Sequence, residues 1–213
     1  MGETYTQVFL IRHGETESNV EGRFRGRANI PLSKNGFVQA SELANSLSET
    51  KIDVIYSSPL LRAKQTAEKL AITKNLPIVE HSGFQNIDLG DWTHKLKDEV
   101  KRDYPIEWAQ WTTLPEYMTI PGGENIIEVR NRARKALDKL VRKHDGENVV
   151  IFTHRAVLKP LIASLLSMPS PFFWKLHLET ASYSLFHYYK GKGYVMQKFN
   201  HTSHLSSIHR EIF

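Results

Sequence analysis

Hydrophobic residues change their spacing along this chain, and the changes predict strands and helices in turn. The continuous apolar run from Val8 to Ile11 is typical of a buried strand, and apolar residues three and four positions apart are typical of a helix. Strands are predicted at 7–11, 52–56, 78–80 and 148–152, and helices at 36–48, 60–71, 124–144 and 156–166. Strands that follow helices in this order form βαβ units. The pattern predicts an α/β fold, a three-layer sandwich with a mostly parallel sheet and helices on both faces.

Two stretches depart from this pattern. Residues 82–121 mix tryptophans, prolines and charges without a clear period, which predicts an irregular, partly helical excursion that covers an active site like a lid. Residues 183–189 and 194–199 are rich in strand-forming residues and flank a glycine-containing turn, which predicts a hairpin at the sheet edge. A chain of 213 residues can bury a large core. We therefore expect residues 1–213 to form a single domain.

The composition narrows the chemistry. The chain has no cysteine, which excludes disulfides, thiolate catalysis and cysteine-ligated metals, and a cytoplasmic location is the simplest expectation. No apolar run approaches the length of a membrane span, so no membrane partner is expected.

A formal net charge of +5 favours acidic ligands, among which phosphate esters and nucleic acids both qualify. Much of this charge lies on the predicted helix 124–144, outside its apolar stripe, and we interpret it as a solvated face. The residues concerned are Arg130, Arg132, Arg134, Lys135, Lys139, Arg142 and Lys143. Since no nucleic-acid-binding motif accompanies them, no nucleic-acid partner is expected.

Two predicted strands are each followed closely by a histidine. Arg12 and His13 follow the first strand, and His154 follows the strand at 148–152. In a parallel sheet both histidines would emerge at the same carboxyl edge, where ligands bind. Arg62 lies in the first turn of a helix that leaves the same edge, and a guanidinium matches phosphate oxygens well. Together the four residues indicate phosphoryl transfer to an imidazole.

These residues belong to a longer series of motifs in a fixed order. The chain resembles the histidine phosphatase superfamily, the group named after cofactor-dependent phosphoglycerate mutase. Its character is closest to the small broad-specificity or α-ribazole-type phosphatases. The matching segments are Leu10 to Thr16 with Asn19, Arg23 to Gly26, Pro31-Leu32 with Gly36, Gln39-Ala40, Ser57 to Ala63 with Gln65-Thr66-Ala67, Gly90 with Trp92, Gly122 to Glu124, and Thr153-His154.

The resemblance implies a role for each of these positions. Neutral His13 would attack phosphorus and form a phosphohistidine, while Arg12, Arg62 and His154 would surround the transferred group. Neither a metal nor an organic cofactor is implied. The substrate-binding positions that we expect are Asn19, Gly14, Thr16, Arg25 and Asn86.

One departure from the family concerns proton transfer. The resemblance implies a glutamate as general acid and base at the position that Asn86 occupies here, and a carboxamide cannot transfer a proton. Asp88 is the first candidate to replace it, because residues two apart in an extended segment face the same side. Asp91 and Glu15 come next. Alternatively, a substrate with a low-pKa leaving group needs little acid help.

Further departures add positive charge near the site. Arg25 stands where a glutamine is common in the family, and it either makes the entrance more cationic or belongs to a solvated loop. Arg155 stands where small residues are common, and we expect it to point outward. His201 and His204 lie three apart without a carboxylate at metal-binding spacing, so we interpret them as structural.

The sequence thus predicts a phosphomonoester hydrolase that acts on a small phosphorylated molecule through phospho-His13. Two alternatives stay open. One is a 2,3-bisphosphoglycerate-dependent phosphoglycerate mutase, although the middle excursion is shorter than in such mutases. The other is a phosphate-binding module with weak or lost turnover, for which Asn86 is the motive. Assembly as a homodimer also stays open.

Overall fold

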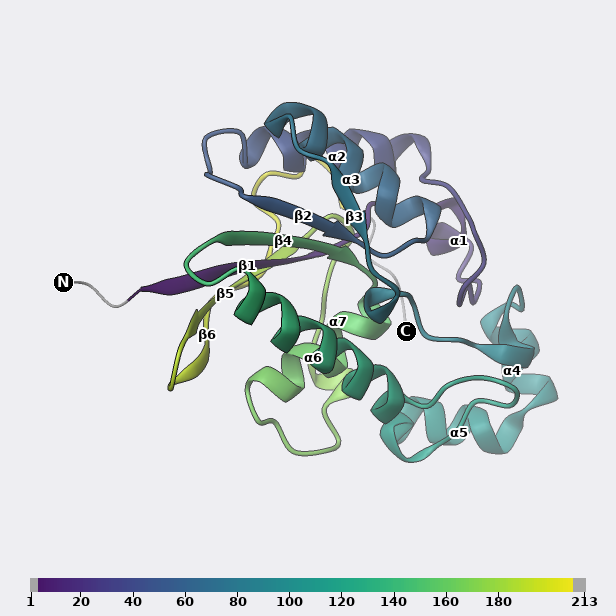
Figure 1. Cartoon of the computed structure of the whole chain (residues 1–213). Coiled ribbons are helices and arrows are strands. Elements are labelled where there is room, and N and C mark those ends of the chain that lie inside the picture. Colours follow the sequence, from purple (N-terminus) through teal and green to yellow (C-terminus); the bar gives the residue numbers. More distant parts are fainter. Residues whose placement is uncertain (1–3, 209–213) are drawn as a thin grey trace.

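A mixed sheet forms the centre of the molecule. In the computed structural model, which describes residues 4–208, its six strands lie in the order β3-β2-β4-β1-β5-β6 (Figure 1). The strands are β1 (Tyr5–Arg12), β2 (Val54–Ser57), β3 (Ile78–Glu80), β4 (Asn148–Thr153), β5 (Tyr183–Tyr189) and β6 (Gly193–His201). The first four strands are mutually parallel, and β5 and β6 form an antiparallel hairpin at one edge.

The register of the parallel strands brings distant segments to one edge. Arg12 at the end of β1 pairs with Thr153 at the end of β4, and Ser57 at the end of β2 pairs with Phe152. Residues 13, 58 and 154 therefore leave the sheet side by side. This is the convergence that the sequence predicts.

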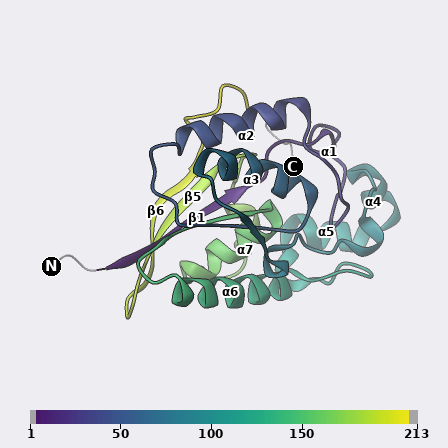
Figure 2. The same ribbon diagram turned by 45° about the horizontal axis from the view of Figure 1, so that its top comes forward.

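Helices cover both faces of the sheet. They are α1 (Glu17–Val20), α2 (Lys34–Ser46), α3 (Leu61–Lys74), α4 (Lys97–Asp103), α5 (Pro105–Thr113), α6 (Ile126–Lys143) and α7 (Arg155–Leu165). Figures 1 and 2 show α2 and α3 on one face, with α6 and α7 on the other. Short 3-10 turns lie at Ser82–Phe84, Gly90–Trp92, Pro115–Tyr117 and Phe173–Lys175. The predicted three-layer α/β sandwich is confirmed.

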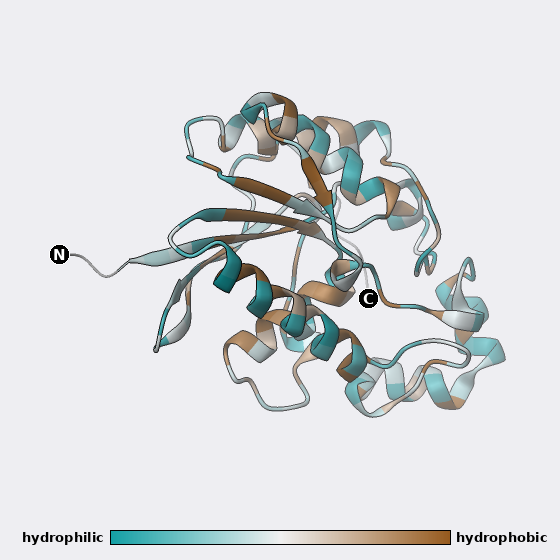
Figure 3. Ribbon diagram, in the orientation of Figure 1, coloured by the Kyte–Doolittle hydropathy of each residue, from teal (hydrophilic) through white to brown (hydrophobic). Residues whose placement is uncertain are grey.

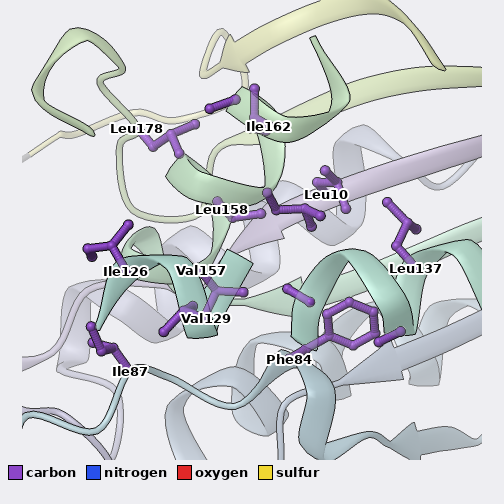
Figure 4. Packing of buried hydrophobic residues seen from close by; sticks show 14 of the residues in the cluster. Leu10, Phe84, Ile87, Ile126, Val129, Leu137, Val157, Leu158, Ile162 and Leu178 are labelled. Carbon is purple, nitrogen blue, oxygen red and sulfur yellow. The ribbon is translucent and has the colours of Figure 1, made fainter. Parts of the chain in front are cut away.

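Two cores flank the sheet because its central strands are apolar on both sides. In β1, Phe9 and Ile11 belong to the core beneath α2 and α3, whereas Val8 and Leu10 belong to the core beneath α6 and α7. Figure 3 shows the hydrophobic strands between helices that are hydrophilic on their outer sides. Figure 4 shows the second core, where Leu10 lies with Leu137 of α6 and Leu158 of α7. Burial of this kind contributes about 25 cal/mol per Å² of apolar surface.

Helix boundaries differ from the predicted ones for local reasons. Helix α2 begins at Lys34, earlier than predicted, because the Ser33 side chain accepts a hydrogen bond from the amide of Gly36. Helix α3 continues to Lys74 and ends where Asn75 adopts a left-handed conformation with φ 52°. Both signals are polar residues at helix ends, which the apolar spacing does not record.

Residues 82–121, where the sequence predicts an excursion, contain α4, α5 and three 3-10 turns. Figure 1 shows α4 and α5 beyond the carboxyl ends of the parallel strands. Trp92 and Trp111 are buried and anchor this excursion to the core beneath α6 and α7. Among the described residues, no helix has the length and apolarity needed to cross a membrane.

Candidate active site

A cavity of about 280 Å³ opens at the carboxyl edge of the sheet. Of the predicted site residues, it is lined by His13, Asn19, Arg25, Asn86 and His154. It also reaches aromatic side chains of the excursion and of the turn at Phe173–Lys175. Segments far apart in the sequence therefore build one site.

His13 is held in a defined orientation. Its Nδ1 lies 2.6 Å from the carbonyl oxygen of Gly14, which can only accept, so Nδ1 carries the proton and Nε2 keeps its lone pair. The backbone of His13 is fixed as well, by its amide to Thr153 O (3.0 Å) and its carbonyl from the Ala181 amide (3.1 Å). Burial, and after it the positive charge of Arg62, hold the pKa of His13 well below its ordinary value. The imidazole is neutral at pH 7 and suited to be a nucleophile.

His154 lies opposite His13 across the cavity. The ring centroids are 5.2 Å apart, and the planes are inclined by 57°. His154 Nε2 is 2.7 Å from the hydroxyl oxygen of Ser58, and burial followed by the charge of Arg62 lowers its pKa well below the ordinary value. Ser58 was not among the predicted site residues, although its place in the Ser57-Ser58-Pro59 turn at a strand end was a usable signal.

Two buried arginines do not line the cavity, but their charges act on both histidines. Arg12 donates from Nη1 to the carbonyl of Leu178 (2.7 Å), and Arg62 donates to the carbonyls of Ala28 (2.8 Å) and Gly26 (3.0 Å). Burial, followed by the charges of Arg25 and Arg12, lowers the pKa of Arg62 to about 9, so Arg62 remains a cation at neutral pH. Repulsion among these cations is relieved when an anion binds. The predicted set of Arg12, His13, Arg62 and His154 is thus brought together.

Gly14 and Thr16 lie beneath the cavity and are not among its lining residues. The Gly14 amide donates to Thr66 Oγ1 (2.9 Å), and a Cβ at Gly14 would come within 2.7 Å of the Gly36 carbonyl oxygen. Gly14 therefore allows the backbone at residue 36 to pack directly against the backbone at residue 14. Thr16 donates from both its amide and its hydroxyl to Asn19 Oδ1, at 2.9 and 2.8 Å, and so positions the Asn19 side chain.

Asn86 lines the cavity, whereas Asp88 does not. Asn86 donates from Nδ2 to the Gly26 carbonyl (2.9 Å), and the Asp88 carboxylate accepts from the Gly90 amide and lies 3.3 Å from Arg27 Nη1. The two side chains do not share a side, because the segment is not a regular strand here. The structure does not bring Asp88 to the histidines.

Several basic residues lie elsewhere than expected. Arg155 lines the cavity, so the expectation that it points outward is wrong. Arg132 is not part of a solvated face, because it donates to the carbonyls of Gly83 (3.0 Å) and Asn86 (3.1 Å) and pairs with Glu124. Sequence spacing places these residues on a helix but does not record which backbone carbonyls face them.

An aromatic wall of the cavity is formed by Phe24, Trp111, Phe173 and Trp174. Trp174 donates from Nε1 to the Trp111 carbonyl (2.6 Å), and the two rings meet edge to face at 5.7 Å. The buried carboxylate of Glu116 accepts from the amides of residues 172 and 173, at 2.6 and 2.8 Å. The run of aromatics at 172–174 was the sequence signal for this wall, which the prediction missed.

The described part of the chain contains no cluster of three His, Cys, Asp or Glu residues that could hold a metal ion. His201 and His204 stack at 5.9 Å, and His204 Nε2 lies 3.1 Å from the carbonyl oxygen of Ala181. These two histidines therefore pack against the segment that supports the backbone of His13.

The fold and the cavity define an α/β enzyme with a histidine and arginine site at the carboxyl edge of its sheet. Residues 8–202 match the family described as the histidine phosphatase superfamily (branch 1), and the chain belongs to this family. The predicted family is thereby confirmed.

Named relatives share nearly the whole chain. Phosphoserine phosphatase 1 of Hydrogenobacter thermophilus is 34% identical over 205 residues, which cover 96% of this chain and 97% of the relative. Adenosylcobalamin/alpha-ribazole phosphatase of Salmonella typhimurium is 30% identical over 178 residues, covering 84% and 88%. The solved structure of YhfR of Bacillus stearothermophilus superimposes with a TM-score of 0.90 at 32% identity, covering 94% of this chain and 99% of that one. The chain is accordingly a phosphatase.

Proposed function

We propose that this phosphatase hydrolyses small phosphomonoesters through a phosphohistidine at His13. The observation that carries the proposal is the hydrogen bond of 2.6 Å from Nδ1 to the Gly14 carbonyl, which leaves Nε2 of a neutral, buried imidazole as the nucleophile. Splitting the reaction into two displacements at phosphorus makes each step easier than direct hydrolysis.

In the first step His13 Nε2 forms a bond to phosphorus, and the bond to the ester oxygen breaks with its electron pair. Arg12 and Arg62 stabilise the charge that gathers on the phosphoryl oxygens. A hydroxyl proton donated by Ser58 to His154 Nε2 places the proton of neutral His154 on Nδ1, where it can donate to a phosphoryl oxygen. Water then attacks phosphorus, and the electron pair of the nitrogen–phosphorus bond returns to His13.

Asn19 and Arg25 are the cavity-lining contacts that we assign to the substrate. The names of the relatives make phosphoserine and a ribazole phosphate reasonable first compounds to test. A cytoplasmic location, the single domain and the homodimer stay predictions from the sequence.

The test compares the parent protein with His13→Ala. The parent should hydrolyse 4-nitrophenyl phosphate and, after a rapid acid-free quench, carry phosphate in a linkage that is labile in acid and stable in base. His13→Ala should lose both properties. The exposed His94 provides a matched control, and His94→Asn should retain them. Equal turnover by His13→Ala and the parent would overturn the proposal.

The amide at position 86 motivates one second candidate, a module that binds phosphate without turning over. Tight binding of vanadate, with no hydrolysis of phosphate esters of any leaving group, would favour this candidate over the hydrolase.

A further inference from the structure

The side chain at position 86 is held in one orientation and, as a carboxamide, cannot transfer a proton to a substrate. Asn86 is 8% exposed, and its Nδ2 donates to the Gly26 carbonyl, which also accepts from Arg62 Nη2. Since a carbonyl can only accept, the amide nitrogen must point toward Gly26. The backbone oxygen of Asn86 accepts from Arg27 (3.3 Å) and Arg132 (3.1 Å), which fixes the main chain.

Among the described residues, no carboxylate takes the place of the missing acid. Among residues 4–208, Glu21 is the one carboxylate that lines the cavity, and it pairs with Arg23 at 3.3 Å with its side chain 54% exposed. Asp88 pairs with Arg27, and the buried Glu15 accepts hydrogen bonds from two neutral side chains beneath the site. Asp88 and Glu15 do not line the cavity, and Glu21 is directed to Arg23, so none of the three is placed to protonate a leaving group.

The histidines do not supply the proton either. Burial and the charge of Arg62 keep both His13 and His154 neutral, and a neutral imidazole is a very weak acid. What the cavity offers in place of an acid is positive charge. Arg25 lines it, and the charge of Arg25 contributes to the lowered pKa of His13, Arg62 and His154. Arg25 therefore lies close to the reacting centre.

The other charged residues that line the cavity are Glu21 and Arg23 after α1, Lys97 on α4 and Arg155 on α7. Arg12 and Arg62 do not line it, but their charges lower the pKa of both histidines, and Arg132 on α6 adds to the lowered pKa of His154. In the part of the chain that the structure describes, the cationic side chains that line the cavity outnumber the one carboxylate that lines it. Such a field stabilises an anion and disfavours a bound proton.

We propose that Arg25 stabilises a leaving group that departs as an anion, so that the phosphorylation of His13 involves no proton transfer. The inference rests on the proposed function. His13 Nε2 donates its pair to phosphorus, the phosphorus–oxygen bond breaks, and its electron pair stays on the departing oxygen beside the guanidinium. The departing oxyanion takes a proton from water only after it has left the cavity.

The substrate class follows from this chemistry and from the aromatic wall. A leaving group that departs unprotonated must be stable as an anion, which favours phosphate esters of acidic hydroxyls over alkyl phosphates. Phe24, Trp111 and Trp174 line the cavity, with the ring centroids of Phe24 and Trp111 6.0 Å apart, and aromatic side chains bind flat apolar groups well. The site therefore suits aryl phosphates.

The experiment measures kcat/KM for a series of substituted phenyl phosphates and for alkyl phosphates, because kcat/KM reports the phosphorylation step even when hydrolysis of phospho-His13 limits kcat. The parent should show a steep fall of kcat/KM with rising leaving-group pKa. Arg25→Gln should steepen this dependence. The loss should reach about 100-fold for the most basic phenol, the typical effect of removing one charge-stabilising donor, and be smaller for the most acidic phenol.

Controls separate this inference from the proposed function. Arg102→Gln removes an exposed arginine on α4 that pairs with Asp103, and it should reproduce the parent series. A shallow dependence in the parent would mean that an acid protonates the leaving group, and an equal loss across the series in Arg25→Gln would mean that Arg25 only binds phosphate. Either result overturns the inference about Arg25. The proposed function is tested separately by His13→Ala, and it stands if that variant loses activity.

Discussion

Acidification should destabilise this protein through its two buried site histidines. His13 and His154 are 2% and 1% exposed, and burial followed by the charge of Arg62 holds both pKa values well below the ordinary value. In the unfolded chain a histidine has a pKa of about 6.5, so His13 and His154 bind protons there at pH values at which they stay neutral in the folded chain. The free energy of unfolding is therefore independent of these groups above pH 6.5, and it falls with pH below that value until the folded-state pKa is reached.

The magnitude follows from linkage. Each histidine that is protonated only in the unfolded chain costs about 1.4 kcal/mol per pH unit, so the pair costs about 2.7 kcal/mol per pH unit between the unfolded-state pKa and the lowered folded-state values. Urea unfolding of the parent and of the double variant His13→Asn, His154→Asn in phosphate-free buffer measures this difference, because carboxylate effects common to both proteins cancel. His94→Asn is the matched control, since residue 94 is exposed and its φ of 71° suits asparagine. Parallel pH dependences of the parent and the double variant would refute the reasoning.

Three further outcomes are expected. Arg62→Met should raise the pKa of His13 in an NMR titration, because the charge of Arg62 contributes to the lowering of that pKa. The same variant should reduce kcat/KM by roughly 10²- to 10³-fold. An unchanged titration of His13 would contradict the electrostatic account. Gly36→Ala should lower the free energy of unfolding by about 1–3 kcal/mol in urea, because a Cβ there collides with the Glu15 carbonyl oxygen. Asn86→Glu should raise kcat/KM for alkyl phosphates more than for aryl phosphates, with up to about 10² to 10⁴ available from acid catalysis; equal effects on both classes would show that no acid was missing.

The sequence was sufficient to predict the sheet and the pairing of His13 with His154, because both follow from the residue pattern within each strand and from the way that parallel strands align. An apolar run that ends in a histidine places that side chain at a strand end, and parallel strands share a carboxyl edge. His13 and His154 needed no more than this to be placed together. The ring separation of 5.2 Å is a consequence of the register between Arg12 and Thr153.

The parts that escaped prediction depend on irregular backbone. The argument that Asp88 shares a side with Asn86 assumed a strand, but residues 85–89 belong to no strand or helix, so regular alternation does not apply to them. The inward position of Arg132 depends on the carbonyls of Gly83 and Asn86, which come from a segment forty residues or more away along the chain. Long-range pairing of this kind has no local sequence signature.

The bonds between the two halves of the aromatic wall limit how this enzyme can be re-engineered. Trp111 and Glu116 come from the excursion, whereas Phe173 and Trp174 come from a turn that follows α7, and three hydrogen bonds join the two segments. Exchanging the excursion alone for one without a carboxylate at position 116 would leave the amides at 172 and 173 without their acceptor, and the indole of Trp174 would need a main-chain carbonyl at the position of residue 111. A change of substrate preference by segment exchange therefore requires both segments to be transplanted together.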